Sequence, residues 1–266
     1  MTTTSTRDGA SLTRIEVHRP VRGGRCEVRL SCSGPADRPR VRPMLLSSDD
    51  DGARVSLVPE GALLLSGDAV VIEVVVGAGA RLELVEPAGT VAYAMSDGGR
   101  ASWDVTIHLA PASSLVWAGE PFVVSEGARV DRRTTVELAW DARLALREVL
   151  VLGRHGERPG ELCQDFDATG PNGTPVLAES LAVGAAFGDL ALGGARVMGT
   201  VTVLGARLPA TDDGTRLDLE AEGTVVRRLA DAAHVAVPDR SWRAARQLMR
   251  EICASTWNSS PSALAR

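Results

Sequence analysis

Short runs of alternating apolar and polar residues dominate the chain from Arg14 onward. Val, Leu, Ile and Thr fill these runs, and Gly, Pro and Asp separate them, which is the pattern of β-strands joined by tight turns. The runs recur at roughly ten-residue spacing, as in all-β sandwiches and solenoids. The predicted strands cover residues 25–32, 53–58, 69–76, 80–86, 102–109, 114–117, 128–139, 143–152, 175–183, 196–204, 215–220 and 223–229.

Near the C-terminal end the period changes from two to that of a helix. Apolar residues recur at helical spacing from Trp242 to Ile252, after Pro238 and two candidate caps, Asp239 and Ser241. This predicts a helix over 239–254.

The polar ends, residues 1–12 and 258–266, are expected to be disordered tails. Two Gly-, Asp- and Pro-containing stretches, 154–173 and 210–215, are expected to be loops. Nothing between them resembles an interdomain linker. The chain is therefore predicted to be mainly β, with a single large sandwich- or solenoid-like domain over 13–257 and a C-terminal helix.

Composition narrows the choice of partners. The formal net charge is -5 and the sequence pI is about 5.5, whereas nucleic-acid binding usually needs a clustered basic surface. The longest apolar run, 69–76, is strand-sized and contains Glu73, and the N-terminus is polar. The cysteines form no CxxC pair. We therefore expect a cytoplasmic protein that binds neither nucleic acid nor membrane.

Conventional catalytic and metal motifs are missing from the sequence. No serine stands in a G-x-S-x-G elbow, and the four histidines are scattered. Cys26 and Cys32 lack a second metal-spaced pair, so they are interpreted as core residues. The acidic run 49–52 lacks the alternating ligands of a calcium loop and is interpreted as a solvated turn.

The unusual feature is a carboxylate in phase with apolar residues. After the predicted turn 140–143, Glu148 shares one strand face with the leucines between 144 and 152. Glu73 and Glu179 repeat the pattern. A buried carboxylate needs a partner. One of the many arginines could supply it, Arg154 being the nearest in sequence to Glu148; alternatively, several such carboxylates line a polar channel or a transient cation site.

The same segments resemble the UreD (UreH) family of urease accessory proteins, over roughly residues 53–250. The resemblance rests on the order and spacing of the segments 60–68, 77–80, 90–93, 115–121, 127–129, 144–148, 153–157 and 222–227. The chain departs from the family at residues 84–87, where a Thr-Thr-Pro or Thr-Gln element is usual, and at Arg147, where Trp commonly precedes the glutamate.

The resemblance implies a protein that is not an enzyme. It implies a complex with a UreF-type adaptor and a UreG-type GTPase that docks on apo-urease and assists nickel delivery, with dimerisation through the adaptor as a further option. It also implies an internal acidic tunnel for transient nickel passage, with no permanently bound cofactor. By motif, Asp68 and Glu179 belong to that path, and Glu148 is a third candidate that either lines it or pairs with an arginine.

Two other functions stay open from the residues alone. A β-fold, glycosidase-like enzyme would use Glu148 and Glu157 as an acid/base pair across an open cleft. A metal-independent adaptor would use the same scaffold without carrying nickel.

Overall fold

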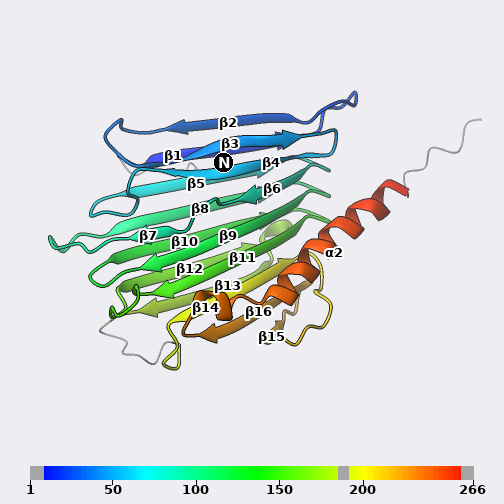
Figure 1. Cartoon of the computed structure of the whole chain (residues 1–266). Helices are drawn as coiled ribbons and strands as arrows, with labels where there is room; N and C mark the ends of the chain where they lie inside the picture. Colours follow the sequence, from blue (N-terminus) through cyan, green and yellow to red (C-terminus); the bar gives the residue numbers. More distant parts are fainter. Residues whose placement is uncertain (1–8, 185–191, 259–266) are drawn as a thin grey trace, which may run out of the picture.

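For most of its length the chain alternates between two β-sheets in the computed structural model, which describes residues 9–184 and 192–258 (Figure 1). The seven-stranded sheet has the order β13-β12-β10-β8-β5-β1-β2, and the nine-stranded sheet has the order β15-β16-β14-β11-β9-β6-β4-β3, with β7 beside β9. The first sheet contains β1 (Ser11–His18), β2 (Glu27–Ser33), β5 (Ala69–Val76), β8 (Ala101–Leu109), β10 (Arg129–Leu138), β12 (Glu161–Thr169) and β13 (Pro175–Val183). The second contains β3 (Arg40–Ser48), β4 (Gly52–Glu60), β6 (Arg81–Val85), β7 (Thr90–Ala92), β9 (Ser114–Val124), β11 (Arg143–Leu152), β14 (Val197–Leu204), β15 (Thr215–Asp218) and β16 (Gly223–Ala230).

The central part of the fold is a solenoid. β1, β5, β8, β10 and β12 are parallel neighbours in one sheet, and β4, β6, β9 and β11 are parallel neighbours in the other. One strand from each sheet therefore makes one coil. Antiparallel pairs close both ends: β1–β2 and β3–β4 at one, and β12–β13, β11–β14 and β14–β16 at the other. The mainly β, solenoid-like fold that the sequence predicts is confirmed.

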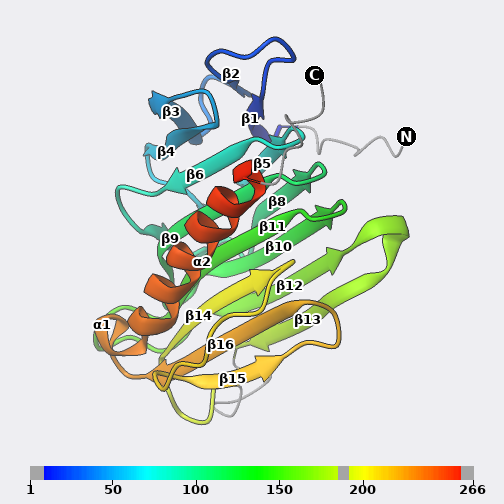
Figure 2. The same ribbon diagram turned by 90° about the vertical axis from the view of Figure 1, so that its right-hand side faces the viewer.

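The core lies between the two sheets (Figure 2). In β8, for example, Trp103, Val105, Ile107 and Leu109 are all buried, and the residues between them face outward. Burying a large apolar side chain such as Ile107 stabilises the fold by about 1.5–3 kcal/mol. The period-two alternation of the sequence is thus the direct consequence of each strand having one inner face.

Two helices, α1 (Ala233–Ala236) and α2 (Asp239–Asn258), lie on the outer face of the nine-stranded sheet (Figure 2). The predicted helix is confirmed, and it extends four residues further. Its first backbone amides are capped by neither of the two predicted residues. Asp213, in the loop before β15, accepts hydrogen bonds from the backbone N–H groups of Arg240 at 2.6 Å and Ser241 at 3.1 Å.

Four strands were not predicted: β1, β3, β7 and β12. β12 lies inside the stretch 154–173, so the prediction of a loop there was wrong for 161–169, while η1 (Pro171–Gly173) follows it. The predicted tail 1–12 was too long, because β1 begins at Ser11. The rest of that tail up to residue 8, and residues 259–266, lie outside the described part of the chain.

Candidate functional site: polar groups between the sheets

The apolar interior is interrupted by a band of polar side chains near one end of the solenoid. Arg132 and Gln164 are register neighbours in the seven-stranded sheet. Opposite them, Glu148 pairs in register with Thr200, which pairs in turn with Arg227. Both sheets thus contribute charged side chains to the interior between them.

Glu148 forms an ion pair that crosses from one sheet to the other. The Nη2 atom of Arg132 lies 2.6 Å from Oε1 of Glu148, and the two side chains are only 13% and 14% exposed. Arg132 also donates to Oε1 of Gln164 at 2.9 Å and stacks its guanidinium over the ring of Phe122 at 5.1 Å. The expectation of a partnered Glu148 is confirmed, and its side chain is largely but not fully buried. The partner is not Arg154, which instead pairs with Glu157 at 2.7 Å.

A second Glu–Arg pair crosses between the sheets with the opposite polarity. Glu179 of β13 accepts a short hydrogen bond from the Nη2 atom of Arg227 of β16. Both side chains are about one-third exposed, at 30% and 29%. They line an open cavity of about 1190 Å³ whose wall also includes Gln164 and Phe166. Gln164 therefore connects this cavity to the Arg132–Glu148 pair.

Glu86 is a third interior carboxylate, which sequence reasoning did not select. It accepts hydrogen bonds from Nε1 of Trp117 at 2.8 Å and from the backbone N–H of Glu120 at 3.0 Å. Burial raises the pKa of Glu86 above its usual range, and these two hydrogen bonds and the charge of Arg132 offset only part of that rise. The sequence pattern that selected Glu148 also holds for Glu86, because Glu86 is in phase with Leu82 and Leu84 along the strand.

A β-bulge explains how the backbone reaches Glu86. The β9–β11 register shifts between Arg147 and Val149, so that Gly119 and Glu120 together lie opposite Glu148. The bulge removes the Glu120 amide from the ladder and directs it at Glu86. A side chain at position 119 has no room, because a Cβ there would lie 2.6 Å from the carbonyl oxygen of Arg147.

A small cavity lies at this bulge. It lies between the two sheets and has a volume of about 30 Å³. Its lining includes Glu86, Arg132 and Glu148, together with the rings of Trp103, Trp117 and Phe122. That volume is about the share of one water molecule in the liquid.

Asp68 lies apart from these groups, in the turn before β5. It is 5% exposed, accepts a hydrogen bond from the backbone N–H of Leu65 at 2.8 Å and pairs with Arg38 at 3.2 Å. It lines neither of the two cavities above. The structure thus places Glu148 and Glu179 between the sheets at two separate cavities, and Asp68 at neither of them.

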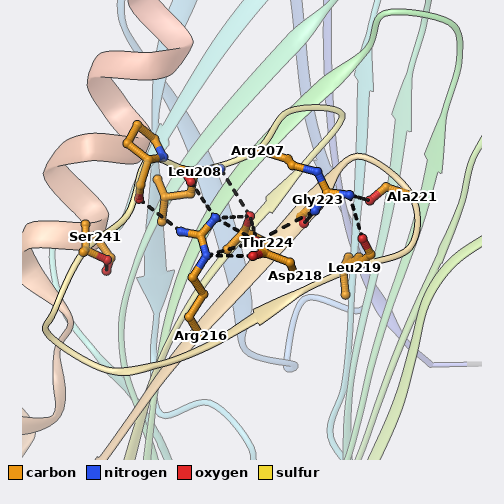
Figure 3. A network of polar contacts seen from close by, with 11 residues as sticks. Arg207, Leu208, Arg216, Asp218, Leu219, Ala221, Gly223, Thr224 and Ser241 are labelled. Atoms are coloured by element: carbon orange, nitrogen blue, oxygen red, sulfur yellow. Dashed lines mark hydrogen bonds and ion pairs between the residues drawn. The ribbon is translucent and has the colours of Figure 1, made fainter.

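The wall of the large cavity is held by a dense polar network (Figure 3). Thr215 and Leu217 of β15 line the cavity, while Arg216 binds Asp218 through contacts of 2.7 and 3.0 Å and donates to the carbonyl oxygen of Leu208 at 2.7 Å. The fully buried hydroxyl of Thr224 also donates to Asp218, at 3.0 Å. The Arg216 hydrogen bond holds the pKa of Asp218 below its ordinary value. These contacts fix β15 against β16.

Comparison with known proteins identifies the family of the chain. The family described as "UreD urease accessory protein" matches residues 15–262. "Urease accessory protein UreD 1" of Streptomyces griseus is 42% identical over 202 residues, which are 71% of this chain and 73% of that protein. The chain belongs to the UreD family. A second relative with the same name, from Saccharopolyspora erythraea, is 39% identical over 72% of this chain and 76% of its own length, and UreD of Streptomyces avermitilis is 34% identical over 72% and 75%.

Metal-ligating residue types are dispersed in the described part of this UreD family member. Among the described residues no group of three or more His, Cys, Asp and Glu side chains could hold a metal ion. Cys26 is buried, as its interpretation as a core residue predicts, and Cys32 is partly buried. The acidic run 49–52 forms a turn in which the Asp49 side chain accepts from the backbone N–H groups of Asp51 and Gly52.

Within the described parts of this UreD family member, no helix is long and apolar enough to span a membrane.

The glycosidase-like alternative is not supported by the geometry. Hydrogen bonds from Arg154 lower the pKa of Glu157 to about 2, so this carboxyl cannot serve as a proton donor near neutral pH. Its supposed partner Glu148 lies in a cavity too small for a sugar.

Proposed function

We propose that this UreD family member is a non-enzymatic scaffold in urease maturation that assists nickel delivery. It forms a cytoplasmic complex with a UreF-type adaptor and a UreG-type GTPase, which docks on apo-urease. Nickel is the cargo and is not retained as a cofactor. The observation that supports this function is that Glu86, Glu148 and Glu179 lie between the sheets of a family member, around two cavities whose walls are joined by the Arg132–Gln164 hydrogen bond; the proposal takes these cavities as one polar passage.

The chemistry of the passage suits transit better than storage. Carboxylate oxygens bind hard and borderline divalent cations, whereas Cys and His clusters hold such ions tightly. Each of Glu148 and Glu179 is neutralised by an arginine, so an ion must compete with a guanidinium at both positions. A carrier built this way binds weakly at several points and releases its cargo.

The scaffold function is tested by expression in a urease-positive host that lacks its own UreD protein. Urease activity should return when this chain is supplied, and the adaptor and GTPase should co-purify with it. A stable protein that neither restores activity nor retains either partner would contradict the scaffold function.

The metal path is tested separately from assembly. Glu179→Gln should lower the nickel content of urease several-fold, while the adaptor and GTPase still co-purify. Asp68→Asn tests the expectation that rests on the family resemblance alone, because Asp68 lies outside the passage. Normal nickel content with both variants would favour a metal-independent adaptor.

A further inference from the structure

The free edge of β3 is apolar, although sheet edges are usually protected by charges. Among the described strands β3 pairs with β4 alone, so it ends the nine-stranded sheet at the N-terminal end of the solenoid (Figure 1). Three consecutive residues of β3, Met44, Leu45 and Leu46, are 49%, 48% and 52% exposed. The unpaired backbone groups of such an edge can bind another strand. An apolar edge of this kind has the features of an interaction surface.

The register of β3 shows to which side of the sheet these side chains point. Leu45 lies opposite Val55, which belongs to the core between the sheets, so Leu45 points inward. Met44, the residue before it, points outward. After the bulge, Ser47 lies opposite Arg54 on the outer face. A strand added at this edge would therefore meet an apolar side chain on its inward side and polar groups on its outward side.

An arginine-lined cavity lies beside the end of this edge, on the outer face of the nine-stranded sheet. It has a volume of about 250 Å³ and extends from the end of β3 to α2. A segment bound at the edge would have this cavity within reach of its side chains. The lining includes Ser47 and Ser48 of β3, Arg54 and Arg81 of β4 and β6, and Arg246 and Arg250 of α2.

Carboxylates are too few for the guanidinium groups of this cavity. Glu83 is the partner of two of them, Arg54 at 3.4 Å and Arg246 at 3.2 Å. Asp49 also lines the cavity, but its carboxylate accepts hydrogen bonds from backbone N–H groups of its own turn. A carboxylate brought by a partner would therefore meet guanidinium groups that share one acid.

The excess of arginine extends through the N-terminal part of the chain. Residues 9–48 contain eight arginines and three carboxylates, although the net charge of the whole chain is -5. Asp51, which follows this part, is shared by Arg19 at 3.2 Å and Arg81 at 3.8 Å. Attraction at long range and contacts at the cavity thus both favour an acidic partner.

We propose that the free edge of β3, over residues 44–48, binds an extended segment of another protein in which acidic and apolar residues alternate. The segment adds a strand to the nine-stranded sheet, and its backbone pairs with that of β3. Because side chains alternate along a strand, the apolar ones cover Leu45 on the inward side while the acidic ones reach the arginine-lined cavity. This interaction is independent of the proposed nickel path.

The first test is fluorescence anisotropy of the purified full chain with a short labelled peptide of alternating glutamate and valine. It should bind at least about tenfold more tightly than a peptide of alternating lysine and valine, whose charges are repelled by the arginines. Arg54→Glu/Arg246→Glu should weaken binding of the acidic peptide by about tenfold. The matched control is Arg14→Glu/Arg133→Glu, which makes the same change of net charge on the outer face of the seven-stranded sheet and should have no effect.

Two further measurements distinguish strand addition from attraction between charges. Leu45→Asn should weaken binding severalfold, whereas Val21→Asn, at a fully exposed position between β1 and β2, should not. The acidic peptide is then N-methylated either at all its valines or at all its glutamates. At least one of these two peptides should fail to bind, because alternate N–H groups of a strand point to the same side. Full binding by both would show that no strand is added.

Equal affinity for the acidic and the lysine peptide would overturn the proposal, as would equal binding by Arg54→Glu/Arg246→Glu and the wild type. Wild-type dimers that Leu45→Asn dissociates in sedimentation velocity, without binding of the peptide, would also overturn it. The edge would then be occupied by a second copy of this chain. Because these assays contain no urease, adaptor, GTPase or nickel, their outcome does not depend on the proposed function in urease maturation.

Discussion

The outer face of the seven-stranded sheet and the interior between the sheets carry the same sequence signal with different consequences. Glu73 lies between Val71 and Val75 and pairs with Arg14 at 3.1 Å, with side chains 26% and 47% exposed. Glu148 lies among leucines and pairs with Arg132 at 2.6 Å, with both side chains about 14% exposed. A glutamate in phase with apolar residues thus shows which side chains share a face, and not whether that face is covered.

The difference matters because water screens only one of the two pairs. An exposed ion pair contributes little to stability, while a buried one has lost the hydration of both charges. Interior pairs therefore need a reason beyond stability to persist. In this chain both interior pairs lie on the passage, and this is why we place the function there rather than on the outer sheet.

The largest expected effect is on stability, when one member of each pair is removed. Arg132→Ala leaves Glu148 buried and uncompensated, which should lower the free energy of unfolding by about 3–5 kcal/mol. Arg14→Ala, which removes the exposed pairs with both Glu16 and Glu73, should lower it by at most about 1 kcal/mol. Urea denaturation of both variants measures the contrast directly. Equal losses would mean that the interior pair is as hydrated as the outer one.

The pH dependence of stability should run in opposite directions for Glu86, whose pKa is raised, and Glu157, whose pKa is lowered. Because burial raises the pKa of Glu86, its contribution is complete below the unfolded value of 4.5 and is lost as pH rises through the folded value. Glu157, lowered from 4.5 to about 2, stabilises above pH 4.5 and loses this contribution as pH falls towards 2.

Unfolding experiments across pH therefore distinguish the two groups. Compared with the wild type, Glu86→Gln should gain in relative stability as pH rises above 4.5, whereas Glu157→Gln should lose in relative stability as pH rises from about 2 to 4.5 and stay constant above that. A Glu86→Gln variant whose stability difference from the wild type does not vary with pH would contradict the burial of an unpaired carboxyl at this position.

The Glu179–Arg227 pair should fall between the two extremes, because its side chains are about 30% exposed and line an open cavity. Glu179→Ala should cost about 1–2 kcal/mol, less than the loss of a fully buried partner because water screens the remaining Arg227 charge. The same urea titration checks this value. A loss as large as that of Arg132→Ala would show that the cavity is not hydrated.

Strands were predictable from sequence where their inner positions are uniformly apolar. The boundaries of β5 and β11 agree with the prediction. In β1, two of the inward positions are Ser11 and Thr13, and in β12 one is Gln164, so the alternation is weak. β3 contains Pro43, which argues against a central strand but is tolerated at the edge of a sheet, where β3 lies.

The site was predictable only in part. The phase of Glu148 and Glu179 with apolar neighbours indicated candidate interior carboxylates. Their partners were not predictable, because Arg132 and Arg227 come from the opposite sheet and only the topology places them. The hydrogen bond from the Glu120 amide to Glu86 depends on a bulge in β9, and the residue pattern of the sequence does not predict that bulge. The solenoid, rather than local sequence, assembles the passage.

The most direct test of the nickel path is the nickel content of urease matured with Glu179→Gln compared with Glu73→Gln. Both variants remove one carboxylate that is paired with an arginine, one in the passage and one on the outer sheet. Urease should carry several-fold less nickel with Glu179→Gln and a wild-type amount with Glu73→Gln, at equal recovery of the accessory complex. Equal nickel content with the two variants would contradict transport through the interior.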